Sequence, residues 1–480
     1  MNNSRLIQSL GLLSNVEKKQ FLRFISSSFV NTDANLVEIT EILYKDENQI
    51  MTREDVFAAI FPGEEFDYFR ISNLLSLVMK HLGEFLVHLH LQEDQQAFQA
   101  FLLAAAREKG MDKLYRSLER KTEKYFDELA VPFDEDFLAK YHFEDERNVF
   151  ALSRNERQDH HYLDQKMEAL ELFYISAMLK TTCQRINQEN VIQSTTHSSR
   201  SAEFIEYITA NIGQFTDSPF IQIYYYILLT LIEPDQESHF ETLKSLLNTF
   251  SGDISHQELK PMFQYAQNYC IKQANRGKTV YQEELLGLYI QMIELELIYQ
   301  DGWLSPWDFK NVVAMGVRLE RFEWTETFIS NYAEKLMPEF RENAMTFNLA
   351  QLYYGKKQYR KAMRLLTQVE FDDVYYLLGA KTILLKMYYE LEEADGFDFL
   401  IHSFSAALRR NKKISNYQRT VHKNLIKWAK KLQRLRNRKY ASGNAAVKKA
   451  IDEFLKHVEE IEAITQKEWL MRKAEEIISF

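Results

Sequence analysis

The chain of 480 residues has few of the residues that interrupt helices or cross-link chains. It contains 7 Pro and 14 Gly, so tight turns are few and long helices are favoured. Its 2 Cys, Cys183 and Cys270, stand far apart, which excludes a disulfide framework and a cysteine-rich metal site. The N-terminus lacks the apolar core and the cleavage site of a secretion signal. Together these absences predict a cytoplasmic protein.

Long apolar runs are also missing. The longest, FIQIYYYILLTLI at 220–232, is too short to cross a bilayer and is interpreted as a buried helix. No membrane partner is therefore expected. Large apolar side chains are nevertheless plentiful, with 33 Phe and 26 Tyr, and hydrophobic residues make up 46% of the chain. Such a composition can bury a sizeable core, so disorder is not expected over most of the length.

Sequence motifs for catalysis or cofactor binding are absent as well. NRGKT at 275–279 has the end of a phosphate-binding loop but lacks the earlier glycine and the preceding strand. His81, His88 and His90 do not have the spacing of a helical zinc-binding pair, and neither do the two histidines of DHHY at 159–162. We therefore expect no catalysis, no cofactor and no metal.

Three segments repeat with a spacing of 35 residues: AMGVRLERFEWTETFISNYAEKL at 314–336, LAQLYYGKKQYRKAMRLLTQVEF at 349–371 and LLKMYYELEEADGFDFLIHSFSA at 384–406. The middle segment resembles a tetratricopeptide repeat, whose period is about 34 residues. Small residues at two of its positions would let two antiparallel helices approach closely. The matching residues are Leu349, Ala350, Tyr353, Tyr359, Ala362, Leu366 and Val369.

This resemblance implies a concave groove lined by the first helix of each pair. The candidate partner-binding residues in that groove are Phe347, Gln351 and Tyr354 in the middle repeat, and Lys386 and Tyr389 in the next. The alternative interpretation is that these side chains pack between neighbouring repeats. The sequence leaves both interpretations open.

Positive charge is concentrated near the C-terminus. Residues 399–451 contain 15 Lys and Arg and no Asp or Glu, in a chain whose net charge is −10, so the remainder carries −25. On a helix, the apolar residues of this stretch fall on one stripe, and cations fall on the opposite face. The apolar stripe is Ile414, Tyr417, Val421, Leu425, Trp428, Leu432 and Leu435, and the cationic face is Arg419, Lys423, Lys427, Lys430 and Arg434.

Three interpretations of the cationic face stay open. It is a solvated outer face, a docking surface for an acidic protein, or a surface that neutralises nucleic-acid phosphates. The aromatic residues Tyr417 and Trp428 are predicted to lie on the apolar stripe and not among the charges. Bases stack on aromatic rings at a charged surface, so this placement argues against binding of single strands.

The segment TREDVFAAIFPGEEFDYFRISNLLSLVMKHLGEFL at 52–86 has the form of a short helix, a turn and a longer helix. It resembles the helix-turn-helix region of bacterial regulators. Its second helix offers few residues suited to bases or phosphates, among them Arg70, Lys80 and His81. The alternative interpretation is a three-helix bundle that packs on the solenoid.

The phrases RRNKKIS, NLIKWAKKL and KEWLMRKAEEI resemble an uncharacterised bacterial family of tetratricopeptide-repeat-like helical proteins. We predict an all-α fold: a right-handed α-solenoid of antiparallel helix pairs, with an N-terminal helical bundle and a C-terminal helical hairpin. The expected segments are a helical region at 1–186, irregular repeats at 200–304, tetratricopeptide-like repeats at 305–411, and a basic amphipathic hairpin with a cap at 412–480. Residues 187–200 are expected to form a linker.

The predicted function is that of a cytoplasmic scaffold or adaptor that binds a protein partner without catalysis, and an acidic protein is one candidate partner. The alternative is a nucleic-acid-associated regulator that uses the basic C-terminal helix or the segment 52–86.

Overall fold

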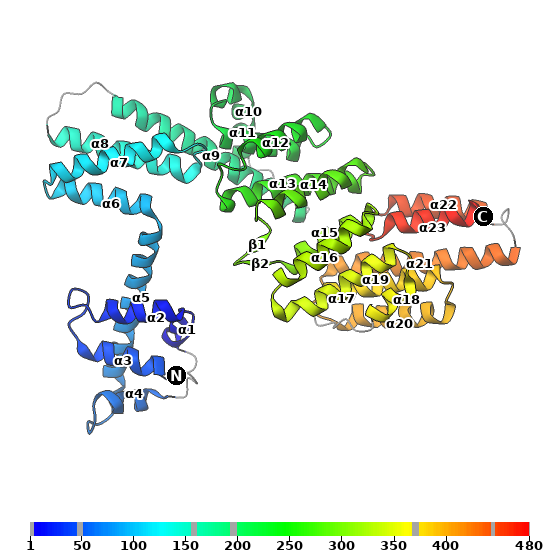
Figure 1. Ribbon diagram of the computed structural model, residues 1–480, viewed down its shortest axis with the longest axis horizontal. Coiled ribbons are helices and arrows are strands. Elements are labelled where there is room, and N and C mark those ends of the chain that lie inside the picture. Colours follow the sequence, from blue (N-terminus) through cyan, green and yellow to red (C-terminus); the bar gives the residue numbers. More distant parts are fainter. Residues whose placement is uncertain are drawn as a thin grey trace. The chain divides into compact units, whose positions relative to one another are not determined.

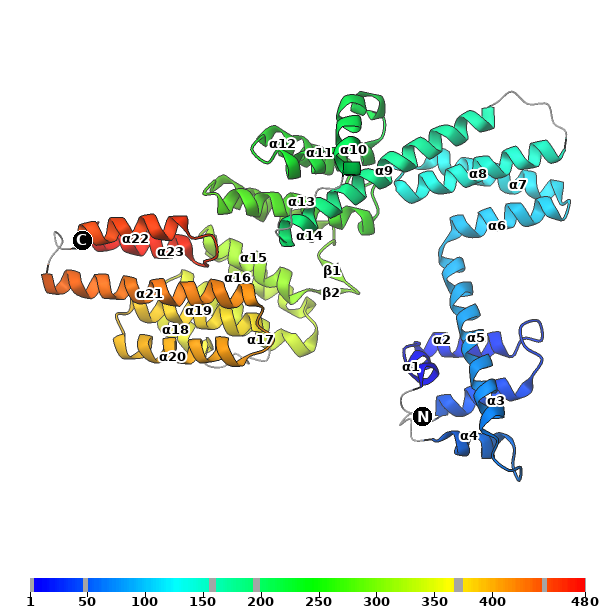
Figure 2. The same ribbon diagram turned by 180° about the vertical axis from the view of Figure 1, so that it is seen from behind.

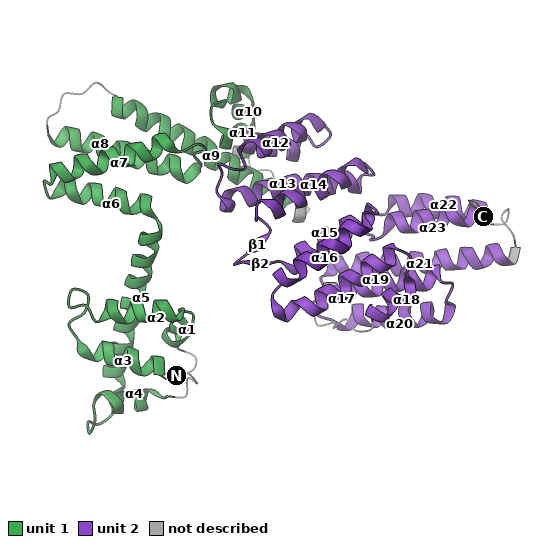
Figure 3. Cartoon of the chain, viewed as in Figure 1, with its two compact units in different colours: residues 1–221 green, residues 222–480 purple. Residues whose placement is uncertain are grey.

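The computed structural model describes residues 4–45, 51–154, 161–192, 199–366, 374–442 and 447–479. These residues form 23 α-helices, two short 3-10 helices and one antiparallel pair of two-residue strands, β1 (Tyr299–Gln300) and β2 (Trp303–Leu304) (Figure 1). The prediction of an all-α protein is therefore confirmed for the described residues. The chain divides into two compact units, Met1–Ile221 (unit 1) and Gln222–Phe480 (unit 2) (Figure 3).

Unit 1 contains the first ten helices, and α11 (Pro219–Ile232) crosses the division between the units. The helices of unit 1 are α1 (Arg5–Gly11), α2 (Asn15–Ile25), α3 (Ala34–Lys45), α4 (Arg53–Ile60), α5 (Tyr68–Glu93), α6 (Gln95–Glu108), α7 (Asp112–Glu128), α8 (Asp134–Ser153), α9 (His161–Ile192), α10 (Ser199–Asn211) and the 3-10 helix η1 (Ile212–Phe215).

Local signals in the sequence explain where several of these helices begin. Ser14 with Glu17 forms a capping box before α2, and Thr52 with Asp55 forms one before α4. Helices α1 to α5 then share one apolar core, in which α5 contacts each of the four others. The segment 52–86 is thus part of a bundle of five helices, α1 to α5, in place of the predicted bundle of three.

The described residues of the predicted linker at 187–200 are helical, so the prediction of a loop is wrong for them. Helix α9 continues to Ile192, and α10 already begins at Ser199. Residues 193–198 lie outside the described part of the chain.

Unit 2 holds the remaining helices and both strands. Its elements after α11 are α12 (Glu237–Phe250), α13 (His256–Asn275), α14 (Val280–Glu294), α15 (Pro306–Arg318), α16 (Phe322–Tyr332), η2 (Ala333–Lys335), α17 (Pro338–Gly355), α18 (Tyr359–Leu366), α19 (Val374–Glu390), α20 (Ala394–Arg410), α21 (Asn416–Ser442), α22 (Lys448–Glu460) and α23 (Lys467–Ser479).

Consecutive helices of unit 2 pack together, as in α15 with α16, α17 with α18 and α19 with α20. Helices two positions apart also touch, because α17 contacts both α15 and α19. Small residues permit this close packing. Ala350 on α17 and Ala362 on α18 are both 0% exposed, as the comparison with a tetratricopeptide repeat predicts for the middle segment.

Gly316 on α15 marks another close approach. A Cβ atom there would lie 2.3 Å from the hydroxyl oxygen of Thr325, which is fully buried on α16 and donates to the carbonyl of Arg321. We expect Gly316→Ala to lower the free energy of unfolding by about 1–3 kcal/mol because the helices must separate. Gly287 on α14 has open space around it, so Gly287→Ala should raise stability by about 0.5–1 kcal/mol. Urea unfolding of both variants measures the difference, and equal effects would contradict the packing.

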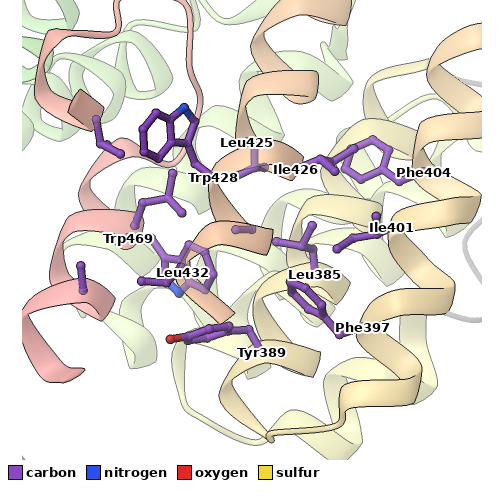
Figure 4. Close-up of a cluster of buried hydrophobic side chains, with 14 of the residues drawn as sticks. Leu385, Tyr389, Phe397, Ile401, Phe404, Leu425, Ile426, Trp428, Leu432 and Trp469 are labelled. Carbon is purple, nitrogen blue, oxygen red and sulfur yellow. The ribbon is translucent and has the colours of Figure 1, made fainter. Parts of the chain in front are cut away.

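The C-terminal helices share a core with α19 and α20 (Figure 4). Helix α21 packs on α20, α22 and α23, and α22 lies beside α23 in both ribbon views (Figure 1 and Figure 2). The predicted apolar stripe is confirmed as buried at six of its seven positions, namely Ile414, Val421, Leu425, Trp428, Leu432 and Leu435.

The seventh stripe residue, Tyr417, is 67% exposed, so that prediction is wrong. Tyr417 is the second residue of α21, whereas buried Ile414 comes from the turn before the helix. The buried stripe on α21 itself therefore begins only at Val421. Helical spacing alone did not show where the helix starts.

Candidate functional site

Two of the predicted groove residues are core residues. Phe347 on α17 is 1% exposed and Tyr389 on α19 is 3% exposed. The Phe347 ring packs edge-on against Tyr376, with ring centroids 5.1 Å apart. Gln351 and Tyr354 are partly buried. The expectation of an open groove face is therefore corrected at Phe347 and Tyr389, where packing between helices is what the structure shows.

The C-terminal helix α23 covers this part of α19. The indole of Trp469 lies edge-on to the Tyr389 ring, with centroids 5.4 Å apart, and is 4% exposed (Figure 4). Its Nε1–H donates to the Glu390 carboxylate at 2.7 Å. Helix α23 therefore covers Tyr389, one of the candidate residues for partner binding.

Glu390, at the end of α19, is the centre of a polar cluster. Its carboxylate accepts hydrogen bonds from the hydroxyls of Tyr354 (2.8 Å) and Tyr359, and it lies 3.9 Å from the Lys473 ammonium. Burial would raise the pKa of Glu390, but these hydrogen bonds, that of Trp469 and the charge of Lys473 outweigh burial and lower it. Below, the term Glu390 cluster denotes Tyr354, Tyr359, Lys386, Glu390, Trp469 and Lys473.

Lys386 is the second charge in the Glu390 cluster. Its ammonium lies 4.7 Å from the centroid of the Tyr354 ring and 6.0 Å from that of Trp469, and it donates to the side-chain oxygen of Gln466 at 2.9 Å. Burial lowers the pKa of Lys386 to about 8, and neighbouring cations add to this effect while Glu390 opposes it. The cluster thus holds an ionised carboxylate beside an amine that titrates near neutral pH.

This titration predicts a pH effect on stability. Unfolded Lys386 has its ordinary pKa of 10.5, so between pH 8 and 10.5 the unfolded state binds more protons than the folded state. Protonated Lys386 therefore reduces stability below pH 8, and the penalty disappears as the pH rises toward 10.5. Compared with Lys386→Met, the wild type should gain about 2 kcal/mol of unfolding free energy between pH 7 and 10. Urea unfolding of both proteins tests this, and a constant difference would contradict a depressed pKa.

The chemistry of the Glu390 cluster suits recognition. A carboxylate fixed by two hydroxyls is a directed acceptor for N–H groups, and the adjacent aromatic rings accommodate an indole or an alkyl chain. In the described residues, no group of three or more His, Cys, Asp or Glu is arranged to hold a metal ion. No sequence pattern marked Glu390, because its partners come from three other helices, α17, α18 and α23.

The cations of α21 present a second candidate surface. A shallow groove along this helix is lined by Lys423, Ile426, Lys427, Lys430, Lys431 and Arg434, and is called the cationic groove below. Lys423, Lys427 and Arg434 are exposed and Lys430 is half-buried. Across the described ranges, none of these Lys and Arg forms an ion pair with a carboxylate. Four of the five predicted face residues are thus gathered in one groove.

Two other arginines of α21 turn inward. The guanidinium of Arg419 donates to the carbonyls of Ile414 (3.1 Å) and Asn411 (3.4 Å). It closes the turn before α21, which corrects its assignment to the free cationic face. Arg436 donates to the carbonyl of Tyr389 at 2.6 Å and lies 4.0 Å from that ring's centroid. The inward position of Arg436 could have been predicted, because residues four apart share one face of a helix and Arg436 follows Leu432 of the apolar stripe by four residues.

The helix-turn-helix-like segment offers few free cations. Arg70 pairs with Glu64 at 2.5 Å and its guanidinium lies 3.6 Å from the centroid of the Phe61 ring. Lys80 and His81 both approach Glu84, at 3.8 Å and 2.8 Å. Arg70, Lys80 and His81, the candidates for base or phosphate contact, therefore each lie beside an acid of the same segment.

Among the helices that the structure describes, none is both long enough and apolar enough for a membrane crossing. Comparison with known proteins yields no match to any protein-family model, curated protein or solved structure. The tetratricopeptide-like family assignment therefore stays a prediction.

Proposed function

We propose that this protein is a non-catalytic interaction scaffold of the cytoplasm, and that the cationic groove of α21 binds an acidic protein partner. The observation that carries this proposal is the gathering of Lys423, Lys427, Lys430, Lys431 and Arg434 in one groove. Carboxylates of the described chain leave these cations unpaired. Their charge is thus available to a partner.

The proposed scaffold is a right-handed solenoid of antiparallel helix pairs in unit 2. The contacts of α17 with α15 and α19, in addition to those within each pair, support this arrangement. Buried Leu425, Trp428 and Leu432 tie α21 to the core of unit 2. The cations consequently project from a fixed helix, which reduces the entropy lost on binding.

The spacing of the cations indicates the form of the partner. Lys423, Lys427, Lys430 and Arg434 follow steps of four, three and four residues, so they span roughly 16 Å along the helix. Glutamates at i, i+4, i+7 and i+11 of a second helix have the same spacing and would face them in register. Ile426 adds an apolar contact within the groove. The proposed ligand is therefore an acidic amphipathic helix.

A second candidate function, binding of single-stranded nucleic acid, is favoured by one observation. Tyr417 is 67% exposed at the start of α21, close in sequence to Lys412 and Lys413. Bases stack on exposed aromatic rings near positive charge, and the exposed Lys412 and Lys413 precede Tyr417 by five and four residues. Tyr417 is thus available for stacking on a base, contrary to the prediction that it lies on the buried stripe. Trp428 is buried as predicted and is not available.

Fluorescence anisotropy tests both candidates. The probes are a helical 15-residue peptide with Glu at i, i+4, i+7 and i+11, a peptide of the same composition with dispersed Glu, and a 20-nucleotide dT strand. We expect the first peptide to bind most tightly, with affinity falling steeply as salt rises. The triple variant Lys423→Glu, Lys427→Glu, Lys430→Glu should lose on the order of 10- to 100-fold in affinity.

The matched control changes the same number of charges at exposed Lys109, Lys113 and Lys121 of unit 1 and should bind as the wild type does. Tighter binding of dT, weakened by Tyr417→Ala, would replace the first candidate with the second. Failure of the wild type to bind any probe at low salt, or an equal loss in the control variant, would contradict the proposed function.

A further inference from the structure

Helix α23 and Gln466, the residue before it, make polar contacts with α15 and α19 in addition to the packing of Trp469 against Tyr389. Trp469 donates to Glu390, Gln466 accepts from Lys386, and Glu468 pairs with Arg318 on α15. Its apolar side packs against α21 and α22, where Leu470, Ala474 and Ile477 are buried. The amphipathic helix α23, of 13 residues, thus makes polar contacts with α15 and α19 and apolar contacts with α21 and α22.

We infer that the surface formed by α19, α21 and α22 is a binding site for an amphipathic helix, and that α23 occupies this site within the same chain. The partner is a helix of another protein that carries Trp-Leu, a cation four residues after the Trp, a small residue five after it and an aliphatic residue eight after it. This pattern is that of Trp469, Leu470, Lys473, Ala474 and Ile477. The inference goes beyond the proposed function because it uses no residue of the cationic groove.

The acceptor at the centre of this site does not depend on α23 for its position. Tyr354 on α17 and Tyr359 on α18 donate hydrogen bonds to the Glu390 carboxylate, and neither residue belongs to α23. If α23 leaves, these two hydrogen bonds remain and the carboxylate keeps its direction. A preorganised acceptor loses little entropy when it receives a new indole N–H.

The ammonium of Lys386 destabilises the state in which α23 occupies the site. Lys386 donates to Gln466 and lies over aromatic rings, but no carboxylate comes within hydrogen-bond distance of its ammonium in the described structure. Enclosing a cation without a directly bonded counter-charge costs free energy. Departure of α23 would return Lys386 to water, which favours exchange of α23 for a partner helix.

The test uses a fluorescent peptide with the sequence of residues 465–479 and the full-length chain. Wild type should bind this peptide weakly, since α23 competes for the site. The full-length variant Trp469→Ala, in which α23 is loosened and the groove residues are unchanged, should bind at least about tenfold more tightly. A peptide with Phe at the Trp469 position keeps a ring but loses the N–H donor, and should bind that variant about tenfold less tightly.

Equal binding of the peptide to wild type and variant, or no binding to a variant that keeps the circular dichroism of the wild type, would overturn the inference. If the variant does not fold, hydrogen exchange of the wild type decides. Amides of α23 should then exchange at least about tenfold faster than those of α21, through local opening. Identical protection of α21 and α23 would overturn the inference. The charge-reversal variant of the cationic groove should bind the peptide as wild type does. A failure of this inference can therefore be distinguished from a failure of the proposed function.

Discussion

Replacing Leu432 with alanine is expected to lower the free energy of unfolding by about 3 kcal/mol. Leu432 is 0% exposed and lies among Leu385, Tyr389 and Trp469 where α19, α21 and α23 meet (Figure 4). Removing its branched end leaves a cavity that rigid helices on three sides cannot fill, and such changes cost about 2–5 kcal/mol. Urea unfolding followed by tryptophan fluorescence measures the effect.

Tyr417→Ala is the matched control for this prediction, because both residues belong to the same predicted stripe of α21. Tyr417 is 67% exposed, so its removal should change stability by no more than about 0.5 kcal/mol. The prediction fails if the two variants lose similar stability, since α21 would then not have one buried side and one free side.

Glu390→Ala should be at least as destabilising, at about 3–5 kcal/mol. The change leaves the Trp469 indole and the hydroxyls of Tyr354 and Tyr359 without their shared acceptor, whereas Lys473 keeps its ion pair with Glu476 at 2.8 Å. Removing one partner of a buried charged network costs more than the network contributes, because the remaining groups stay buried and unpaired. The cation of Lys386 would also lose its nearest opposing charge, so its pKa should fall further.

Two comparisons make the Glu390 prediction specific. Glu342→Ala removes an exposed carboxylate of α17 and should be close to neutral. A double-mutant cycle with Trp469→Phe should give a coupling energy of about 1 kcal/mol or more, since that change removes the N–H donor and keeps the ring. Independent effects of the two changes would show that the indole and the carboxylate do not interact.

The buried side of α21 was predictable because its signal is local. Apolar residues three and four apart over more than twenty positions fix one face, and burial of Val421, Leu425, Trp428, Leu432 and Leu435 confirms that face. Ala350 and Ala362 were predictable for a similar reason, since small residues at repeat positions mark helix contacts. The error at Tyr417 arose where the helix begins, which periodicity determines poorly.

The covering of the predicted partner-binding residues by other parts of the chain could not be predicted in the same way. The hydrogen bond from Trp469 to Glu390 joins residues 79 positions apart, and nothing in either segment specifies the other. Phe347 and Tyr389 were correctly placed on helices, but the sequence did not show whether a partner or another part of the chain would cover them. Glu390 is one acid among 69 Asp and Glu, and only its neighbours in space distinguish it.

Hydroxyl-radical footprinting of the wild-type protein tests the central claim most directly, because it reads the exposure of the aromatic residues on both sides of α21 in one experiment. Tryptophan is intrinsically the more reactive residue, yet Tyr417 should be oxidised at least about tenfold faster than Trp428 and Trp469, which are 6% and 4% exposed. Oxidation of Trp428 and Trp469 as fast as that of Tyr417 would show that α22 and α23 do not cover α21 and α19, and would contradict the account.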